Sequence, residues 1–586
     1  MKGVPGRTQL TDRITIDLAT EADRQEIYRL RHQVYAAELH QHQENSDARL
    51  SDLLDAHNTY LKASVAGQLA GFVSLTSPEG PSYSVDKYFK REEFDFPFDS
   101  GLYEVRLLTV LPDYRGLACA SLLMYAALRW VQSLGGTRIV AIGRRELLGL
   151  YRKAGLRTLH RRTQSGAVTY ELLSAPVTEL AEQAEKHSPL LRWLEQRSEW
   201  RLDIPFRSRA ACYHGGAFFE AIGEEFDHLE RSRDVINADV LDAWFPPSPR
   251  VVAALDQYLP WLLRTSPPTN CAGMIRAIAR ARNLPPECIV PGAGSSALIF
   301  LCFREWLNRD SRVLLLDPSY GEYSHITERI LHCQVDRLPL DRTNHYTVDT
   351  GELETRLQAG YDLVVIVNPN SPTGRHIPRR DLESVVARIP DRTRVWMDET
   401  YVEYAGEGES LEAFASRRHN VMVCKSMSKV YALSGTRAAY LCAAPATAIL
   451  LREITPPWAV SLPAQVAAVN ALGDTEYYAA RYRETRVLRE NLAGALHALG
   501  IEVVPGAANF ILCHLPEGGP DAATVCRRCR TQDVFLRDVS GISERLGAHA
   551  LRVAVKDRQS NSRIVETLKW AITTEAEGPT ALAESA

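Results

Sequence analysis

Residues 426–437 of the chain read Ser-Met-Ser-Lys-Val-Tyr-Ala-Leu-Ser-Gly-Thr-Arg. A lysine amine can condense with an aldehyde as a Schiff base and can later carry a proton to and from substrate carbon, which makes Lys429 a candidate catalytic group. Arg437 offers guanidinium donors that keep their protons, and Ser426 and Ser428 offer hydroxyl groups on the same turn, as a phosphate requires. The stretch predicts a site for a phosphorylated aldehyde, pyridoxal 5′-phosphate.

A glycine-rich turn precedes an apolar run at residues 291–300, which read Pro-Gly-Ala-Gly-Ser-Ser-Ala-Leu-Ile-Phe. The apolar run predicts a helix, and the free N–H groups and dipole at the start of a helix attract an anion. We therefore expect Gly294, Ser295 and Ser296 to bind the cofactor phosphate.

Three apolar runs, at residues 313–316, 363–367 and 394–397, predict buried strands, and polar or aromatic residues follow each of them. A buried carboxylate at a strand end can keep a pyridine nitrogen protonated, so that the cofactor ring draws electrons from substrate. The candidates are Tyr320 for stacking on the ring, Asn370 and Ser371 for the adjoining loop, Asp398 for the ring nitrogen and Tyr401 for the ring oxygen.

Residues from about 214 to 557 resemble fold-type I pyridoxal-phosphate enzymes of the class I/II aminotransferase superfamily, closest in pattern to histidinol-phosphate aminotransferases and threonine-phosphate decarboxylases. The matching motifs are G-x-G-S at 292–295, N-P-x-x-P-T-G at 368–374, D-E-x-Y at 398–401, S-x-S-K at 426–429, Arg437, and L-R-V at 551–553. The resemblance implies that Arg552 clamps the α-carboxylate of a small amino-acid substrate and that the chain forms a homodimer through this region. Arg537 is a candidate second anion contact, and the alternative for it is a surface ion pair.

Two positions depart from that superfamily. Ser371 stands where asparagine usually precedes Pro-Thr-Gly, and residues 266–273 lack the tyrosine that usually reaches the phosphate across the dimer interface. Because both positions adjoin the cofactor, two reactions stay open. We expect transamination, and the alternative is decarboxylation, or β/γ-elimination or replacement with C–C bond formation.

The first third of the chain has a different pattern. A strand at residues 103–110, a loop of small residues at 112–120 and an apolar helix at 121–134 predict a backbone site for a pyrophosphate. With residues 28–39 and 150–156, they resemble GCN5-related N-acyltransferases (GNAT), including the subgroup of acyl-homoserine-lactone and N-acyl amino acid synthases. The resemblance implies an acyl-CoA or acyl carrier protein donor held by Arg115, Gly116, Ala118 and Ala120, with Tyr151 as general acid. The alternative is a non-catalytic binding or dimerisation domain.

Composition narrows the class of protein. The chain has 586 residues, 45% hydrophobic and 24% charged, with a formal net charge of −4, which gives no electrostatic reason to expect nucleic acid or an anionic membrane. No apolar run approaches the length of a membrane span and the N-terminus lacks a signal-peptide core, so we expect a cytoplasmic protein. The pair Cys526 and Cys529 is a lone C-x-x-C, and we expect no metal site.

We expect an α/β protein with two enzyme modules. Residues 1–175 would form the GNAT-like domain, 176–212 a helical linker and 213–575 the aminotransferase-like domain. Within the latter, residues 249–445 would form a large three-layer domain around a mostly parallel sheet, and residues 446–574, with the preceding arm, a small α+β domain. Residues 576–586 would be a disordered tail.

Overall fold

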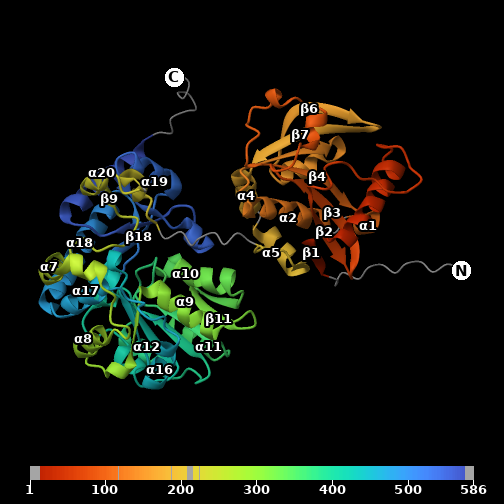
Figure 1. Cartoon of the computed structure of the whole chain (residues 1–586). Helices are drawn as coiled ribbons and strands as arrows, with labels where there is room; N and C mark the ends of the chain where they lie inside the picture. The colour runs from red at the N-terminus through yellow and green to blue at the C-terminus, as the bar shows by residue number, and fades with distance from the viewer. Residues whose placement is uncertain (1–12, 116–117, 187, 207–214, 224, 575–586) are drawn as a thin grey trace. The chain divides into compact units, whose positions relative to one another are not determined.

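The computed structural model describes residues 13–115, 118–186, 188–206, 215–223 and 225–574. The chain divides into two compact units, Met1–Ala210 and Ala211–Ala586 (Figure 1). Gly116 and the predicted tail at 576–586 lie outside the described residues. The mixed α/β architecture expected from the sequence is confirmed.

The first unit is built on an eight-stranded sheet in the order β6-β7-β5-β4-β3-β2-β1-β8. Its strands are β1 (Ile14–Leu18), β2 (Thr59–Val65), β3 (Gln68–Thr76), β4 (Leu102–Val110), β5 (Arg138–Arg144), β6 (Arg157–Ser165), β7 (Val168–Pro176) and β8 (Ser198–Trp200). Helix α1 (Glu21–Arg31) packs through Ile27 on Tyr60, whereas α2 (Cys119–Ser133) packs on the neighbouring Leu61. Because neighbouring side chains on a strand point to opposite faces, the two helices cover opposite faces of the sheet.

Strands β4 and β5 pair over only part of their length. Their parallel register runs from Leu102 opposite Arg138 to Glu104 opposite Val140, although both strands continue further. Leu107 has a φ of 57°, and the register of β4 with β3 shifts in the same region. The outer parts of β4 and β5 are therefore unpaired with each other, which leaves a gap in the sheet next to the short helix α3 (Leu148–Lys153).

The segment expected as a linker contributes to the first unit. It forms α4 (Val177–Lys186), α5 (Ser188–Arg197) and β8, and β8 adds to the sheet beside β1. Leu180, Leu191 and Leu194 are buried in the same apolar core as α2. Burial of these leucines stabilises the association of α4 and α5 with the sheet.

The second unit contains a seven-stranded sheet in the order β10-β16-β15-β14-β13-β11-β12. The strands are β10 (Ile289–Gly292), β11 (Arg312–Asp317), β12 (Gln334–Pro339), β13 (Leu363–Val367), β14 (Arg394–Asp398), β15 (Val421–Ser426) and β16 (Ala439–Cys442). All neighbours pair parallel except β16, which is antiparallel to β10 and β15. Every residue of β13 is buried, because helices cover both faces of a parallel sheet.

Helices form the outer layers of this sheet. On one face α9 (Ser295–Trp306) packs on side chains such as Val313, and on the other α8 (Ala272–Arg282) and α12 (Arg379–Val386) belong to the core that contains Leu314. The remaining helices of the region are α7 (Pro249–Arg264), α10 (Gly321–Ser324), α11 (Thr350–Leu357), α13 (Val402–Ala405), α14 (Glu412–Ala415), α15 (Met427–Val430), α16 (Pro445–Glu453) and α17 (Leu462–Leu472). The parallel strands end at one edge, where the predicted cofactor residues follow them.

The C-terminal part of the second unit has its own antiparallel sheet, in the order β17-β18-β21-β20. Its elements are β17 (Glu502–Val503), β18 (Phe510–His514), β20 (Arg537–Asp538), β21 (Ala550–Ala554), α18 (Thr475–Ala498), α19 (Ala522–Arg530) and α20 (Arg558–Thr573). The segment before α7 contains α6 (Phe218–Ile222) and β9 (Ile236–Asn237), and β9 pairs in parallel with β19 (Val534–Phe535). This pairing holds the arm on the C-terminal sheet, next to β20 and β21.

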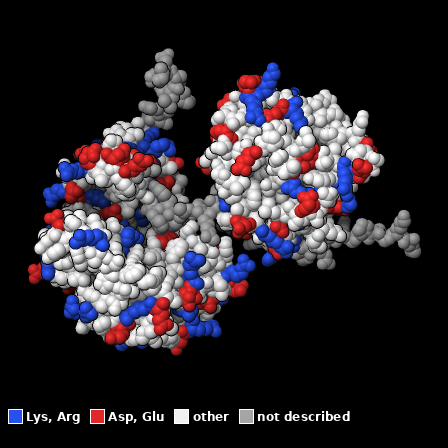
Figure 2. All heavy atoms as spheres, viewed as in Figure 1, with Lys and Arg blue, Asp and Glu red and all other residues white. Residues whose placement is uncertain are grey.

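Positive and negative side chains alternate over the visible faces of both units, without a large patch of one sign (Figure 2). Within the described ranges, no helix combines the length and the hydropathy that a bilayer crossing needs. Cys526 and Cys529 are free thiols buried on α19.

Candidate active sites

Lys429 lies on α15, immediately after β15. Its Nζ atom donates a hydrogen bond to Oδ1 of Asp242 at 2.8 Å and lies 3.4 Å from Oγ of Ser434. Burial lowers the pKa of the Lys429 amine, the Asp242 carboxylate raises it, and the Arg437 guanidinium lowers it again. The resulting pKa is below the ordinary value, which favours the neutral, nucleophilic form of the amine.

Asp242 and Lys556 are candidates that the sequence patterns did not reveal. Asp242 lies on the arm between β9 and α7, and its backbone oxygen accepts a hydrogen bond from Nζ of Lys556 at 3.2 Å. Burial lowers the pKa of Lys556 to about 8. Lys556 lies two residues beyond β21 (Ala550–Ala554), so the strand pattern around Arg552 gave no signal for it.

Asp398 ends β14 and is buried. Its Oδ2 accepts a hydrogen bond from the hydroxyl of Tyr323 at 2.7 Å, and its Oδ1 accepts from the N–H and the hydroxyl of Thr400. The Tyr323 hydroxyl in turn accepts from Nε1 of Trp396 at 2.8 Å. Burial raises the pKa of Asp398, and the hydrogen bonds from Thr400 and Tyr323 act in the opposite direction. A cation, such as a protonated ring nitrogen, would offset the cost of the buried negative charge.

Gly294 and Arg437 meet at the predicted phosphate end. Gly294 has a φ of 92°, and a Cβ atom added to it would lie 2.5 Å from Nη2 of Arg437. Only glycine therefore allows the guanidinium to approach the turn before α9. On the lysine side, Ser426 caps α15 by accepting a hydrogen bond from the backbone N–H of Ser428 at 3.3 Å. The glycine turn and the lysine turn are thus brought together around Arg437.

The hydroxyl groups near the start of α9 converge on a carboxylate. Ser296 and Tyr320 both donate to Oε2 of Glu322, at 2.9 Å and 2.8 Å. Ser295 is the first residue of α9, so its backbone N–H is directed outward at the helix N-terminus. The backbone at Ser295, rather than the Ser296 hydroxyl, is the better anion donor in this arrangement.

The loop after β13 links the predicted cofactor residues to the predicted substrate residue. Nδ2 of Asn370 donates to the backbone oxygen of Pro318 at 3.0 Å and to Oγ1 of Thr373 at 3.1 Å, which stiffens the loop. Ser371 accepts a hydrogen bond from Nη1 of Arg552 at 3.2 Å. The serine that departs from the superfamily pattern therefore contacts the arginine expected to bind substrate.

Arg552 and Arg537 lie opposite each other on β21 and β20. Nη2 of Arg552 donates to the backbone oxygen of Asp239 at 3.2 Å, and Nη1 of Arg537 lies 3.6 Å from Oδ1 of Asp239. Burial lowers the pKa of Arg552 to about 10, so it stays charged at neutral pH. Arg537 forms an ion pair that is buried rather than at the surface.

These residues fit pyridoxal phosphate. Nε of Arg552 is buried and makes no hydrogen bond to any described residue, so the guanidinium has a donor to spare for a carboxylate. The ring of the buried Tyr401 packs edge-on against Phe510, with 5.2 Å between ring centroids, and the Arg552 guanidinium lies over the same Phe510 ring. Such a cofactor and its amino-acid substrate require an amine, an acid for the ring nitrogen, a guanidinium for the phosphate and a second guanidinium for the carboxylate. These groups are supplied by Lys429, Asp398, Arg437 and Arg552.

A buried ionic network supports this site from behind. Lys425, the residue before Ser426, lies 2.8 Å from Glu403 and 3.6 Å from Glu399. Arg282 of α8 also binds Glu403, at 2.7 Å. Burial raises the pKa of Glu399 to about 7. The network links β15 and the segment after β14 to α8, and the sequence patterns did not predict it.

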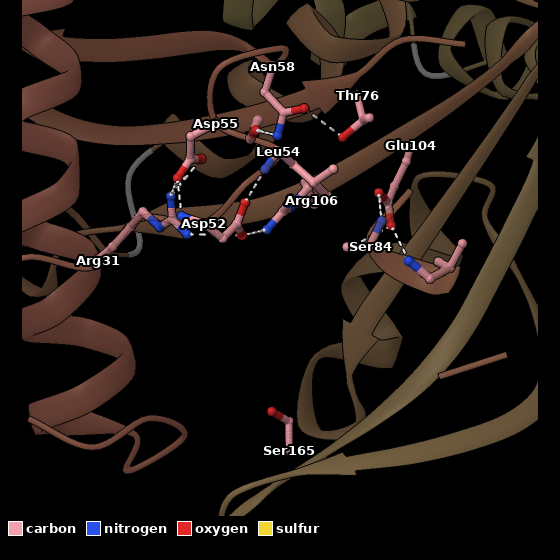
Figure 3. Close-up of polar contacts among 12 residues, drawn as sticks. Arg31, Asp52, Leu54, Asp55, Asn58, Thr76, Ser84, Glu104, Arg106 and Ser165 are labelled. Atoms are coloured by element: carbon pink, nitrogen blue, oxygen red, sulfur yellow. Dashed lines mark hydrogen bonds and ion pairs between the residues drawn. The ribbon is translucent and has the colours of Figure 1, made fainter. Parts of the chain in front are cut away.

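The first unit has a cavity of about 530 Å³ beside β4. On one wall, Arg31 lies 2.7 Å from Asp55 and 3.4 Å from Asp52, and Arg106 of β4 also binds Asp52. Figure 3 shows the two guanidinium groups reaching these carboxylates from different elements. In the same figure, Glu104 accepts hydrogen bonds from the backbone N–H groups of Ser84 and Val85. The wall is polar and its charges are paired, which suits a polar, charged ligand.

The predicted acyltransfer residues lie around this cavity. Tyr151 lines it, and burial raises the pKa of its hydroxyl to about 12, so the group keeps its proton at neutral pH. Ala120 and Arg115 line it as well, and Arg115 forms an ion pair with Glu38 at 3.0 Å. Ala118 precedes the first turn of α2. Gly116 lies outside the described residues.

Comparisons with known proteins divide the chain in the same way. Residues 245–568 match the family model "Aminotransferase class I and II", and residues 23–156 match "Acetyltransferase (GNAT) family". A histidinol-phosphate aminotransferase of Anaeromyxobacter sp. (strain Fw109-5) is 31% identical over 352 residues, which are 59% of this chain and 94% of that protein. A relative with the same name from Symbiobacterium thermophilum is 29% identical over 326 residues, 56% of this chain and 87% of that protein.

Solved structures agree on the fold. The histidinol-phosphate aminotransferase of Clostridium acetobutylicum has a TM-score of 0.51 at 23% identity and covers 56% of this chain and 96% of its own. The histidinol-phosphate aminotransferase of Sinorhizobium meliloti was solved in complex with pyridoxal-5′-phosphate. It has a TM-score of 0.52 at 20% identity, and the match covers 62% of this chain and 99% of its own. Because the aminotransferase model matches more than half of the chain, this protein belongs to the class I and II aminotransferases, pyridoxal-phosphate-dependent transferases of fold type I, and carries a GNAT-like segment before that region.

Proposed function

We propose that the second unit transfers an amino group between an α-amino acid and a 2-oxo acid, with pyridoxal phosphate bound at Lys429. The observation that carries the proposal is the Lys429 amine, which Asp242 holds directly after β15, at the sheet edge where Asp398 ends the neighbouring parallel strand β14. The names of the relatives, which include a structure with pyridoxal phosphate, support the same cofactor. When bound, this cofactor supplies an aldehyde for amine exchange and a ring that accepts electrons from Cα.

Each residue of this site has a separate role in the transfer. Nζ of Lys429 takes the proton from substrate Cα and returns it, a role that the lowered pKa of its amine favours. Asp398 holds a proton at the ring nitrogen. Arg437 and the N–H groups at the start of α9 bind phosphate. Arg552 binds the substrate carboxylate through two parallel hydrogen bonds and thereby orients Cα toward Lys429.

The test uses the purified full-length protein with a panel of amino acids and 2-oxo acids, and mass spectrometry of the products. We expect paired appearance of a new 2-oxo acid and a new amino acid, and loss of both with Lys429→Ala. Glu453→Ala, an exposed change on α16, is the control for expression and folding. A Schiff base between Lys429 and the cofactor would absorb near the edge of the visible spectrum. A Lys429→Ala protein that still showed this absorbance would contradict the role of Lys429.

A second reaction is favoured by one observation, the hydrogen bond from Arg552 to Ser371. This contact occupies one edge of the guanidinium, and a substrate carboxylate held by the remaining edge would be oriented differently. Orientation decides which bond at Cα breaks, so decarboxylation, or elimination or replacement at Cβ or Cγ, is the alternative. Release of CO2 or of a leaving group in the same mass-spectrometric panel, without a new 2-oxo acid, would select it.

We propose that the first unit transfers an acyl group from a thioester to a primary amine. The GNAT match and the position of Tyr151 at the cavity support this proposal. The amine nitrogen forms a bond to the thioester carbonyl carbon, the C–S bond breaks, and one proton passes from nitrogen to sulfur, with Tyr151 donating to sulfur and regaining its proton from the amine. Release of free thiol in the presence of acyl-CoA and amines would be measured. Tyr151→Phe should reduce it by roughly 10²- to 10⁴-fold.

We propose that two copies of the chain associate through α7. The helix exposes five large apolar side chains, each 44% to 71% accessible, namely Val252, Tyr258, Leu259, Trp261 and Leu263. Val252, Leu259 and Leu263 lie on one face of the helix, seven and four residues apart, and an exposed apolar face of this kind marks a protein interface. Light scattering should give a dimer for the native protein and a monomer for Leu259→Glu/Leu263→Glu, with Gln257→Glu on the same helix as the control. A native monomer would contradict the proposal.

A further inference from the structure

Tyrosine hydroxyls bind the backbone at the end of the turn that carries Lys429. Helix α15 is a single turn, and the last carbonyl groups of a helix have no partner within it. Three phenol groups donate hydrogen bonds to consecutive carbonyls: Tyr404 to that of Lys429 at 2.7 Å, Tyr482 to that of Val430 at 2.9 Å, and Tyr478 to that of Tyr431 at 3.2 Å. The turn is therefore held from outside by two helices, α13 and α18.

The hydroxyl that contacts Lys429 itself comes from a fixed side chain. Tyr404 belongs to α13 and is only 2% exposed. The preceding residue, Glu403, forms a buried ion pair with Lys425 at 2.8 Å, which anchors α13 to β15. The Tyr404 ring also packs edge-on against Tyr482 of α18, with 5.3 Å between ring centroids. Close packing on these sides leaves the Tyr404 hydroxyl one place, and it defines a position for the carbonyl that it binds.

The same hydrogen bond ties Lys429 to Asp398. Asp398 ends β14, six residues before Tyr404, and Lys429 lies after the neighbouring parallel strand β15. The contact between Tyr404 and Lys429 thus joins the segments that follow the two strands. In pyridoxal phosphate the ring nitrogen and the aldehyde lie on opposite sides of the ring, so a cofactor that meets Asp398 and Lys429 needs a fixed separation between these residues. The Tyr404 hydroxyl restricts changes in that separation.

We propose that Tyr404, supported by Tyr482, is a positioning residue that places the Lys429 amine for its reaction with the cofactor aldehyde. The inference rests on the pyridoxal-phosphate chemistry proposed above. Asp242 holds the amine end of the lysine, and Tyr404 holds its backbone end. A misplacement of about 1 Å in a reacting group can cost roughly 10²-fold in rate, so even a partial shift of the turn has a measurable effect.

The rate at which the full-length, cofactor-free protein reacts with pyridoxal phosphate, followed by absorbance, tests the inference. In Tyr404→Phe we expect this rate and kcat to fall about tenfold. The affinity for pyridoxamine 5′-phosphate, which has no aldehyde, and the KM for the amino acid should stay unchanged, because the contacts to phosphate and carboxylate remain. Tyr482→Phe should lower the rate by a smaller factor and serves if Tyr404→Phe does not fold. Tyr346→Phe, which removes an equally buried hydroxyl that binds His514, is the matched control and should lower only the stability to urea.

The outcomes separate this inference from the function on which it rests. A native reaction rate in Tyr404→Phe would overturn the inference. An equal loss of rate in Tyr346→Phe would also overturn it, because the effect would then come from general destabilisation. Weaker binding of pyridoxamine 5′-phosphate by Tyr404→Phe would overturn it as well, since the hydroxyl would then act on the cofactor pocket and not on the lysine. None of these results affects the cofactor chemistry, which fails only if the absorbance persists in Lys429→Ala.

Discussion

Nζ of Lys429 lies 2.8 Å from Oδ1 of Asp242, a residue 187 positions earlier in the chain. The same carboxylate oxygen accepts a hydrogen bond from the hydroxyl of Ser434 at 2.6 Å. The amine is thereby held in one place before any aldehyde reaches it. It must leave this ion pair to act as a nucleophile, and its lowered pKa makes the loss of a proton easier. Asp242 is thus a positioning residue for Lys429.

Asp242→Asn should lower the pH midpoint at which Lys429 reacts with pyridoxal phosphate. The carboxylate raises the pKa of Lys429, so its removal lowers that pKa further and increases the neutral fraction at pH 7. Each unit by which the pKa falls increases that fraction about tenfold. The rate of the absorbance change on mixing with pyridoxal phosphate, followed from pH 6 to 10, measures the midpoint. Asp256→Asn, at an exposed position on α7, is the control, and an unchanged midpoint would rule out the ion pair as a determinant of this pKa.

Lys556 should make substrate binding depend on pH near 8. Its pKa is lowered to about 8, so its positive charge is present below that pH and is lost above it. We expect the dissociation constant for an amino acid to rise between pH 7 and 9. Lys556→Arg should remove the step, because arginine stays charged throughout. Lys556→Met should also remove the step, and its affinity for the amino acid should match the weaker affinity of the native protein at high pH. A step that persists in both variants would assign it to another group.

Arg552→Lys should weaken substrate binding. A lysine cannot form the two parallel hydrogen bonds of a guanidinium, and losing one hydrogen bond to a charged group costs about 1.5–3 kcal/mol, or roughly 10- to 150-fold in KM. Steady-state kinetics with an amino acid and with the corresponding amine, which lacks the carboxylate, measure the effect. Only the amino acid should be affected. Arg545→Lys, at a partly exposed ion pair with Asp341, is the control.

Asp398→Asn should reduce turnover much more than cofactor binding. The amide cannot hold the proton at the ring nitrogen, and a positioned acid or base contributes roughly 10²- to 10⁴-fold to rate. The contacts to phosphate remain, so the protein should still bind the cofactor. Tyr323→Phe removes one donor that lowers the pKa of Asp398 and should cause a smaller loss. Equal turnover in Asp398→Asn and the native protein would contradict the role of this carboxylate.

His514 should make the second unit less stable in acid. It is buried, stacks on Tyr346 and has its pKa lowered to about 4. Because the unfolded chain binds a proton at about pH 6.5 and the folded chain does so only near pH 4, stability is complete above pH 6.5 and is lost as the pH falls through this interval. In His514→Gln, the free energy of unfolding measured with urea should differ less between pH 7 and pH 5 than it does in the native protein. His419→Gln, an exposed histidine, should leave it unchanged.

Much of the second unit could be predicted from local patterns. The uninterrupted apolar runs at 313–316 and 363–367 form strands β11 and β13, because a strand covered on both faces needs apolar residues at every position. Asp398 could be identified for a related reason, since it ends such a strand, whereas Lys429 could be identified from the serines beside it and from Arg437. A residue that follows a parallel strand must lie at the carboxyl edge of the sheet, whatever the rest of the chain does.

Contacts between distant segments could not be predicted in this way. Asp242 reaches Lys429 because β9 pairs with β19, and nothing in either segment specifies that pairing. Ser371 was noticed as a departure, but its hydrogen bond to Arg552 depends on how the loop after β13 faces the C-terminal sheet. The residues of α4 and α5 indicated only helices, and their position against the sheet comes from the packing of leucines such as Leu180 and Leu191.

The amino-acid sequence by itself therefore determined the cofactor chemistry, through Lys429, Asp398, Arg437 and the strands that present them. Their roles follow from residue type and from position at the end of a strand, both of which are local properties. Only the tertiary structure decided what surrounds that chemistry, including the Asp242 carboxylate and the Lys556 amine. Those features arise from long-range packing, in which the free energy depends on how distant apolar faces fit together rather than on any one segment.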